Sequence, residues 1–166
     1  MDIKDVKGDL INPSSIQVTI SRGASREEFE GTQIVQKKSD IVFVVDSTDS
    51  MLEEITTVKN TVVDFANKLE ESSINYSLAL VEFKDYPALP CGVSKDFPYK
   101  VHTFSGKNFT NNAAELKNEV EKISIGGGYD IPESHLAALN ASLFLNFEND
   151  AIKIVVLLSD ATPHAK

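Results

Sequence analysis

The chain has 166 residues, which is enough for one domain with a substantial hydrophobic core, and its formal net charge is -9. This acidic balance argues against binding to nucleic acid or to acidic lipid surfaces. Cys91 is the only cysteine, which excludes an internal disulfide and a cluster of several thiolates around a metal. No stretch is apolar for long enough to insert into a membrane, and the first residues lack the apolar core of a signal peptide. As written, the sequence predicts a cytoplasmic protein, although a fragment of an extracellular or cell-surface protein would look the same.

Residues 1–38 are expected to form an N-terminal extension that is only partly ordered. Within it, residues 16–20 alternate between apolar and polar and could form a strand, but glycine, serine and charged residues surround them. The pattern becomes regular from residue 39 onward. We therefore expect residues 39–166 to form one domain.

Strands and helices alternate along this domain. Short β-branched runs predict strands, and apolar residues spaced by threes and fours predict helices. The strands are predicted at about 40–46, 76–83, 99–104 and 152–158, and the helices at about 51–71, 112–124 and 132–147. The order β-α-β-β-α-α-β predicts an α/β fold with a doubly wound, mostly parallel sheet and helices on both faces.

The last predicted strand, residues 152–158, is almost wholly apolar, as a strand with neighbours on both sides should be. We expect the strand at about 40–46 to lie on one side of it. The other edge is left without a predicted partner, because only eight residues follow Leu158. An uncovered apolar edge favours self-association. A longer parent domain, the N-terminal segment or a second chain could cover it, and we favour the longer parent domain.

Oxygen-bearing side chains follow the first strand. Asp46 closes an apolar run, and Thr48 and Ser50 follow at alternate positions. Ser50 and Glu53 have the spacing of a helix capping box, which would explain Ser50 without any metal. Capping does not explain Asp46 or Thr48. Oxygen ligands at the carboxyl end of a parallel strand suit a hard divalent cation.

Two further acids occur in similar places. Asp160 closes the last apolar strand, and Asp130 follows the run Gly126–Gly128. Asp130 could simply cap the next helix, with Pro132 and Glu133 in its first turn. The three glycines exceed what a cap needs and indicate close backbone packing or unusual dihedral angles. Because clustered carboxylates repel one another unless a cation neutralises them, the three acidic motifs together favour a metal site.

Four motifs in this order are similar to those of von Willebrand factor type A domains that carry a metal-ion-dependent adhesion site, especially in the prokaryotic and alpha-kinase-like branch. They are Asp46-x-Thr48-x-Ser50-Met51, Phe83-Lys84-Asp85-Tyr86, the run from Gly126 to Glu133, and the run from Ser159 to His164. The resemblance implies a Rossmann-like fold whose last strands would follow residue 166. It also implies a non-enzymatic module that binds Mg²⁺, Mn²⁺ or Ca²⁺ and, through the ion, a carboxylate of a partner protein. The implied metal ligands are Asp46, Thr48, Ser50, Asp130 and Asp160.

Two positions depart from the family pattern. Asp49 stands where the family usually has glycine, and Tyr129 is inserted before Asp130. An additional carboxylate near the ion would weaken the capture of an acidic ligand. Two other functions stay open, namely a structural or assembly domain with a degenerate metal site, and a phosphoryl-transfer enzyme with Asp46 as the nucleophile.

Overall fold

A computed structural model of the chain describes residues 37–72, 74–130 and 132–164. Its centre is a four-stranded sheet with the strand order β3-β2-β1-β5. Strands β1, β2 and β5 are parallel, and β3 is a short antiparallel strand at one edge. These strands are β1 (Ser39–Asp46), β2 (Tyr76–Phe83), β3 (Lys100–Val101) and β5 (Ile152–Leu158). A second, two-stranded parallel sheet pairs β4 (Pro132–Glu133) with β6 (Thr162–Pro163).

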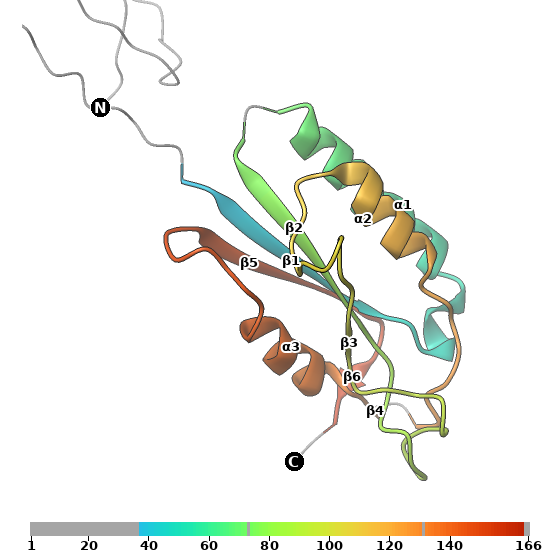
Figure 1. The fold of residues 1–166 in the computed structure, drawn as a ribbon. Coiled ribbons are helices and arrows are strands. Elements are labelled where there is room, and N and C mark those ends of the chain that lie inside the picture. Colours follow the sequence, from blue (N-terminus) through green and yellow to red (C-terminus); the bar gives the residue numbers. More distant parts are fainter. Residues whose placement is uncertain (1–36, 73, 131, 165–166) are drawn as a thin grey trace, which may run out of the picture. The chain divides into compact units, whose positions relative to one another are not determined.

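Helices cover both faces of the large sheet (Figure 1). Helices α1 (Ile55–Glu70) and α2 (Ala113–Glu121) lie on one face, and α3 (His135–Leu143) lies on the other. The alternation of side chains along β1 explains the two layers. Phe43 and its alternate neighbours pack with α1 and α2, whereas Val42 and Val44 pack with α3. The predicted doubly wound α/β fold is confirmed.

The ends of the helices differ from the prediction. Residues Asp49–Leu52 form a separate 3-10 turn, η1, and α1 begins only at Ile55 without a side-chain cap, so the predicted capping box of Ser50 and Glu53 is wrong. Helix α3 begins at His135, three residues later than predicted, because Pro132 and Glu133 pair with β6 instead. The tertiary pairing therefore overrides the local capping signals.

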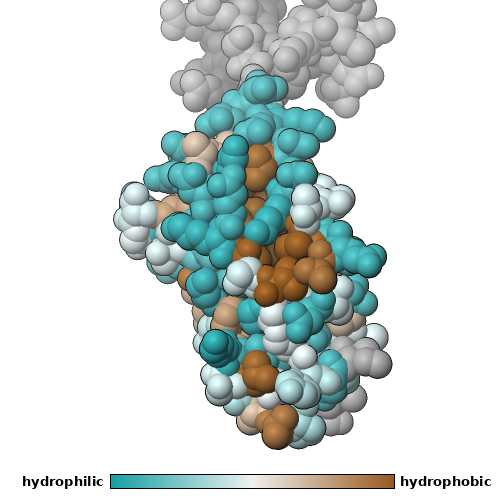
Figure 2. Space-filling model, turned by 90° about the vertical axis from the view of Figure 1, so that its right-hand side faces the viewer, coloured by the Kyte–Doolittle hydropathy of each residue, from teal (hydrophilic) through white to brown (hydrophobic). Residues whose placement is uncertain are grey.

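Strand β5 is less enclosed than its sequence predicts. It pairs with β1 on one side, and no strand within the described ranges pairs with its other side. Ile152, Ile154, Val155 and Leu157 are all exposed by more than a third. Figure 2 shows hydrophobic atoms gathered in a patch with hydrophilic atoms around it on one side of the molecule.

Residues 1–36, with the strand predicted at 16–20, lie outside the described part of the chain, so the domain boundary at residue 38 stays a prediction. Across the described ranges, no helix is long and apolar enough to span a membrane.

Candidate functional site

The candidate site lies where β1 and β5 end side by side. Val45 of β1 pairs with Leu158 of β5, so Asp46 and Ser159 are the next residues along two neighbouring parallel strands. The adjacency of these two strands was predicted from the sequence. As a result, segments more than 100 residues apart in the chain bring their polar side chains to the same edge of the sheet.

A continuous series of short contacts between oxygen atoms joins four of the predicted ligands. The Thr48 hydroxyl donates to Asp46 Oδ1 at 2.7 Å, and the Thr48 and Ser50 hydroxyl oxygens are 3.2 Å apart. The Ser50 hydroxyl donates to Asp160 Oδ1 at 2.8 Å. Asp46 and Thr48 are fully buried, whereas Ser50 and Asp160 are exposed. The site therefore has a buried floor and a rim that faces solvent.

Asp46 is held in place by both of its carboxylate oxygens. Oδ1 also accepts the backbone N–H of Thr48 at 3.0 Å, and Oδ2 accepts the hydroxyl of Ser159 at 2.6 Å. Ser159 in turn lies 2.8 Å from Nε2 of His135, at the start of α3. The sequence analysis assigned no role to Ser159 or His135, although the position of Ser159 directly before Asp160 was a usable signal.

Glu133 is a site residue that the sequence analysis missed, because it was interpreted as a helix-capping residue. Its side chain is buried, and its Oε2 atom has no hydrogen-bond partner among the described residues. Burial and then the nearby carboxylates of Asp46 and Asp85 raise the pKa of Glu133 to about 8, although a polar contact with Thr48 opposes them. Glu133 therefore places a further buried carboxyl group beside Asp46 and Thr48.

The glycine loop packs against the same site. Gly127 and Gly128 have positive φ angles of 85° and 72°. A Cβ atom at Gly128 would lie 2.7 Å from Oε1 of Glu133, and one at Gly127 would lie 1.7 Å from Oδ1 of Asp96. Both the close packing and the unusual dihedral angles that the three glycines indicated are therefore present.

Lys84 connects the loops around the site. Its ammonium group donates to the carbonyl oxygens of Ser47, Ser124 and Gly126. Burial lowers the pKa of Lys84, while nearby carboxylates, led by Glu82, raise it. Lys84 thus fixes the backbone of the first loop to the backbone that leads into the glycine loop.

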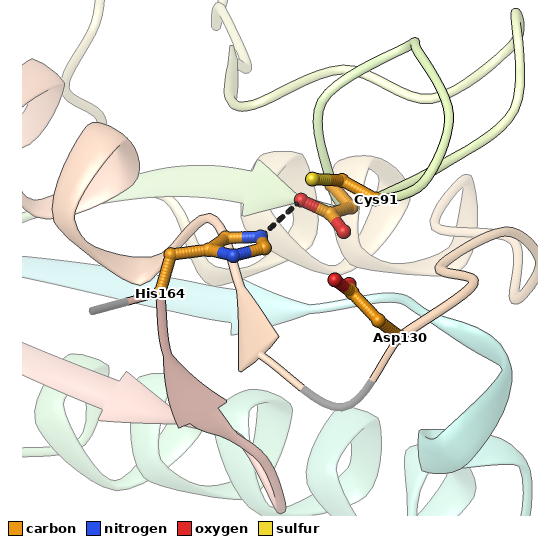
Figure 3. Close-up of side chains that lie close together, drawn as sticks. Cys91, Asp130 and His164 are labelled. Carbon is orange, nitrogen blue, oxygen red and sulfur yellow. Dashed lines mark hydrogen bonds and ion pairs between the residues drawn. The ribbon is translucent and has the colours of Figure 1, made fainter. Parts of the chain in front are cut away.

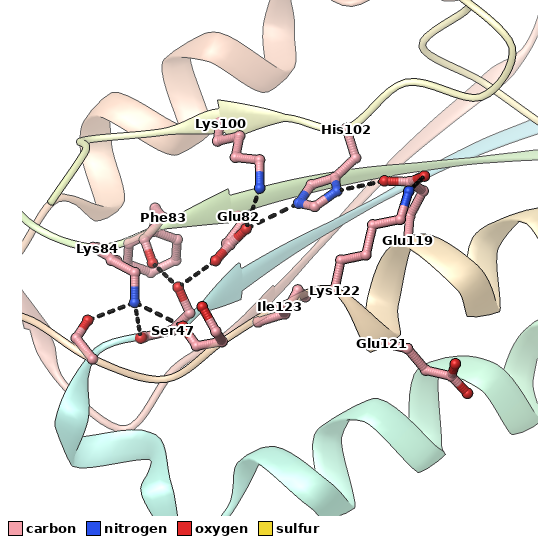
Figure 4. A network of polar contacts seen from close by, with 12 residues as sticks. Ser47, Glu82, Phe83, Lys84, Lys100, His102, Glu119, Glu121, Lys122 and Ile123 are labelled. Carbon is pink, nitrogen blue, oxygen red and sulfur yellow. Dashed lines mark hydrogen bonds and ion pairs between the residues drawn. The ribbon is translucent and has the colours of Figure 1, made fainter. Parts of the chain in front are cut away.

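A buried polar network supports this arrangement from the side of β3 (Figure 4). The Ser47 hydroxyl donates to Oε1 of Glu82 at 2.9 Å, and Oε2 of Glu82 lies 3.0 Å from Nε2 of His102. Nδ1 of His102 lies 3.1 Å from Glu119 on α2. His102 is buried between these two carboxylates.

Asp130, the fifth predicted ligand, lies in a different group of side chains. Its carboxylate gathers with Asp85, Cys91 and His164, and one ligand atom from each residue lies within 4.8 Å of the others. Figure 3 shows Cys91, Asp130 and His164 pointing toward one another from separate segments. Burial and then the carboxylates of Asp130 and Asp85 raise the pKa of the Cys91 thiol. Among the described residues, no hydrogen bond joins Asp130 to the series that runs from Asp46 to Asp160, so its assignment as a ligand of the first site stays a prediction.

Comparisons with known proteins agree with this fold. The chain is 22% identical to integrin beta-5 of Bos taurus over 174 residues, covering 93% of the chain and 22% of that protein. It is 25% identical to alpha-protein kinase vwkA of Dictyostelium discoideum over 127 residues, covering 75% of the chain and 19% of the kinase. The chain thus spans less than a quarter of the length of these relatives.

Among solved structures, the chain resembles the pilus adhesin SpaC from Lactobacillus rhamnosus GG. The TM-score is 0.54 at 20% sequence identity, and the match covers 76% of this chain and 16% of the adhesin. This likeness supports the fold. A family model described as von Willebrand factor A domain matches residues 40–166, which is most of the chain. The chain therefore belongs to the von Willebrand factor A domain family.

Proposed function

We propose that the chain is a non-enzymatic binding module in which Asp46, Thr48, Ser50 and Asp160 bind Mg²⁺, and that the ion captures a carboxylate of a partner protein. The observation that carries the proposal is the series of closely spaced oxygen atoms at the ends of β1 and β5. All of these donors are oxygen atoms, which a hard cation such as Mg²⁺ prefers to nitrogen or sulfur.

The spacing of the oxygen atoms fits an octahedral ion. Mg²⁺ binds oxygen at about 2.0–2.1 Å, so neighbouring ligand atoms lie about 2.9 Å apart. The contacts from Asp46 through Thr48 and Ser50 to Asp160 measure 2.7, 3.2 and 2.8 Å. An ion could therefore replace these contacts with little movement of the side chains. Ca²⁺ requires ligand distances of about 2.3–2.6 Å, so it would need a wider site.

The buried carboxyl groups also favour a cation. Asp46 is fully buried and lies close enough to Glu133 to raise the pKa of Glu133. A divalent ion would compensate for this repulsion, and the unpartnered Oε2 of Glu133 could bind the ion or one of its water molecules. Glu133 is therefore better supported than Asp130 as the acidic residue that the glycine loop and its continuation contribute.

The solvent-facing rim allows a partner to reach the ion. Ser50 and Asp160 are exposed, as is Asp49 on η1. Mg²⁺ in proteins usually keeps several water ligands, and a partner carboxylate can replace one of them. Relatives named as an integrin subunit and a pilus adhesin support a binding role. Asp46 is poorly suited to be a phosphoryl-transfer nucleophile, because it is fully buried and both its oxygens accept hydrogen bonds.

Calorimetric titration of Mg²⁺ into the chelator-treated chain tests the metal site. We expect one bound ion and the loss of binding in Asp160→Asn. A short labelled peptide with one glutamate then tests the ligand, with the same peptide carrying glutamine as its control. Binding of the glutamate peptide alone, and only with Mg²⁺, is the expected result.

The variant Asp49→Gly refines this test, because it removes one negative charge at the rim. We expect it to bind the glutamate peptide more tightly than the wild type does, while its Mg²⁺ affinity changes less. Mg²⁺ binding without any preference for the glutamate peptide would refute ligand capture. Absence of Mg²⁺ binding would favour a structural domain with a degenerate site.

A further inference from the structure

We propose that Asp85, Cys91, Asp130 and His164 form a second metal site, which binds a transition-metal ion of the Zn²⁺ type. The four side chains come from four separate segments. Asp85 follows β2, Cys91 lies in the connection between β2 and β3, Asp130 follows the glycine loop, and His164 follows β6. Their convergence is a product of the tertiary fold (Figure 3).

Backbone pairing fixes these segments to one another. The amide of Tyr129 donates to the carbonyl oxygen of Cys91 at 2.8 Å, which joins the Asp130 loop to the Cys91 loop. The amide of His164 donates to the carbonyl oxygen of Glu133 at 3.3 Å, as part of the pairing of β4 with β6. The backbone segments that carry Cys91, Asp130 and His164 are therefore held by contacts that do not depend on a metal.

Two buried carboxylate oxygen atoms of this group lack a hydrogen-bond partner among the described residues, which indicates that the site binds a cation. Asp85 is fully buried, and its Oδ2 atom has no hydrogen-bond partner among the described residues. Oδ1 of Asp130 is buried and is likewise without a partner in that part of the chain. Leaving a buried carboxylate oxygen unpaired is costly, and native proteins rarely do so without an ion or a water molecule. Two such atoms converge in the same group of four side chains.

Hydrogen bonds to Oδ1 of Asp85 hold its carboxylate in place and so fix the direction of Oδ2. Oδ1 accepts the backbone amide of Tyr86 at 2.7 Å and the hydroxyl of Ser134 at 3.2 Å, and it lies 2.7 Å from Nε2 of His164. Metal ligands are commonly held in this way by neighbouring hydrogen bonds. Within the described part of the chain, Asp85 forms an ion pair with His164 and with no lysine or arginine.

The types of donor atom identify the class of metal. A sulfur, an imidazole nitrogen and two carboxylate oxygens suit Zn²⁺, whereas Mg²⁺ and Ca²⁺ prefer oxygen alone. Four ligands at Zn²⁺ bond lengths of about 2.0–2.3 Å lie roughly 3.3–3.8 Å apart in a tetrahedron. The four ligand atoms lie within 4.8 Å of one another, so binding draws any pair together by at most a little more than an ångström. On binding, the thiol releases its proton to solvent and neutral His164 offers a nitrogen lone pair.

The site is distinct from the proposed Mg²⁺ site and can be tested separately. The chelator-treated chain is titrated with Zn²⁺ in a large excess of Mg²⁺, which keeps the hard-cation site occupied. We expect one Zn²⁺ per chain. The variants Cys91→Ser and His164→Gln should each weaken zinc binding by about 100-fold or more, because removal of a ligand should exceed the 10- to 100-fold effect of outer-shell partners.

Two matched controls separate this site from general effects. Ser94→Ala changes an exposed residue of the Cys91 loop, and Asp160→Asn removes a ligand of the proposed Mg²⁺ site. Both should keep the wild-type affinity for Zn²⁺. Far-ultraviolet circular dichroism shows whether each variant is folded.

The absorption spectrum of the wild-type chain with Co²⁺ bound tests the site without any substitution. This measurement is therefore independent of whether the variants fold. A thiolate-to-cobalt charge-transfer band that Zn²⁺ removes is the expected result. Wild-type zinc affinity in folded Cys91→Ser, or a Co²⁺ complex without the thiolate band, would overturn the proposal.

Discussion

Replacing Asp46 by asparagine tests the first metal site most directly. Asparagine has nearly the same shape and keeps one oxygen that can accept the bonds from Thr48, but it removes a negative charge from a fully buried position. Without metal, the loss of charged hydrogen bonds opposes the relief of repulsion with Glu133. We therefore expect the free energy of unfolding of the metal-free variant to stay within about 1 kcal/mol of the wild type.

Mg²⁺ should separate the two proteins. An ion that binds the folded state alone adds about 2.7 kcal/mol at a concentration of 100 times its Kd. For a chain of this length, each kcal/mol raises the unfolding temperature by about 2–4 °C, so the wild type should gain roughly 5–11 °C. Asp46→Asn loses the central charged ligand, and its unfolding temperature should hardly respond at the same Mg²⁺ concentration.

Thermal unfolding followed by circular dichroism measures both effects, with NaCl added to match ionic strength. Asp64→Asn, which removes a charge from an exposed position on α1, is the control and should shift as the wild type does. An equal Mg²⁺ shift in Asp46→Asn and Asp64→Asn would refute the assignment of Asp46 as a metal ligand.

Three further predictions concern the glycine loop, the polar network and the sheet edge. Gly128→Ala should destabilise the fold by about 1–3 kcal/mol in urea unfolding, because it combines a positive φ of 72° with a close approach to Glu133. Gly106 has a φ of 82°, and a Cβ atom added there would meet no atom of the described residues within 4 Å, so Gly106→Ala isolates the dihedral strain. An equal loss in both variants would show that the contact with Glu133 is unimportant. Burial alone would raise the pKa of Glu82, but hydrogen bonds with His102 and Ser47 and the positive charge of Lys100 outweigh it and lower the pKa overall. The stability that ionised Glu82 contributes is therefore present above its unfolded pKa and is lost as the pH falls through its folded pKa. Glu82→Gln should flatten the decline of the urea midpoint between about pH 5 and pH 3. A decline as steep as that of the wild type would contradict this prediction. Val155→Lys places a charge on the exposed part of β5 and should reduce concentration-dependent self-association in sedimentation velocity, whereas Asn118→Lys on α2 adds the same charge and should not.

The main strands could be predicted closely because their signal is local and strong. The apolar runs that became β1 and β2 are nearly continuous, since helices cover both faces of these parallel strands. The run that became β5 is equally apolar, although most of its side chains are exposed. Helix ends were predicted less well. Ser50 and Glu53 have the spacing of a capping box, but the hydroxyl of Ser50 bonds to Asp160 instead. A residue 110 positions away thus outcompeted the local partner.

Residues with more than one available role were the hardest to assign. The sequence predicts Glu133 in the first turn of a helix, and only the pairing of β4 with β6 places it in a strand beside Asp46 and Thr48. His102 lies near a short edge strand, yet Glu82 and Glu119 enclose it. Neither the position of Glu133 nor that of His102 leaves a local pattern in the sequence, because the residues around them come from other elements.

The sequence by itself determined the α/β class, the adjacency of β1 and β5, and the polar residues at the ends of those strands. These features follow from apolar periodicity and from the rule that parallel strands end at the same edge of a sheet. Only the tertiary structure decided that Asp130 gathers with Asp85, Cys91 and His164. The physical reason is that the direction of a side chain after a flexible glycine loop depends on long-range contacts, here those of Gly128 with Asp96 and of Tyr129 with Cys91.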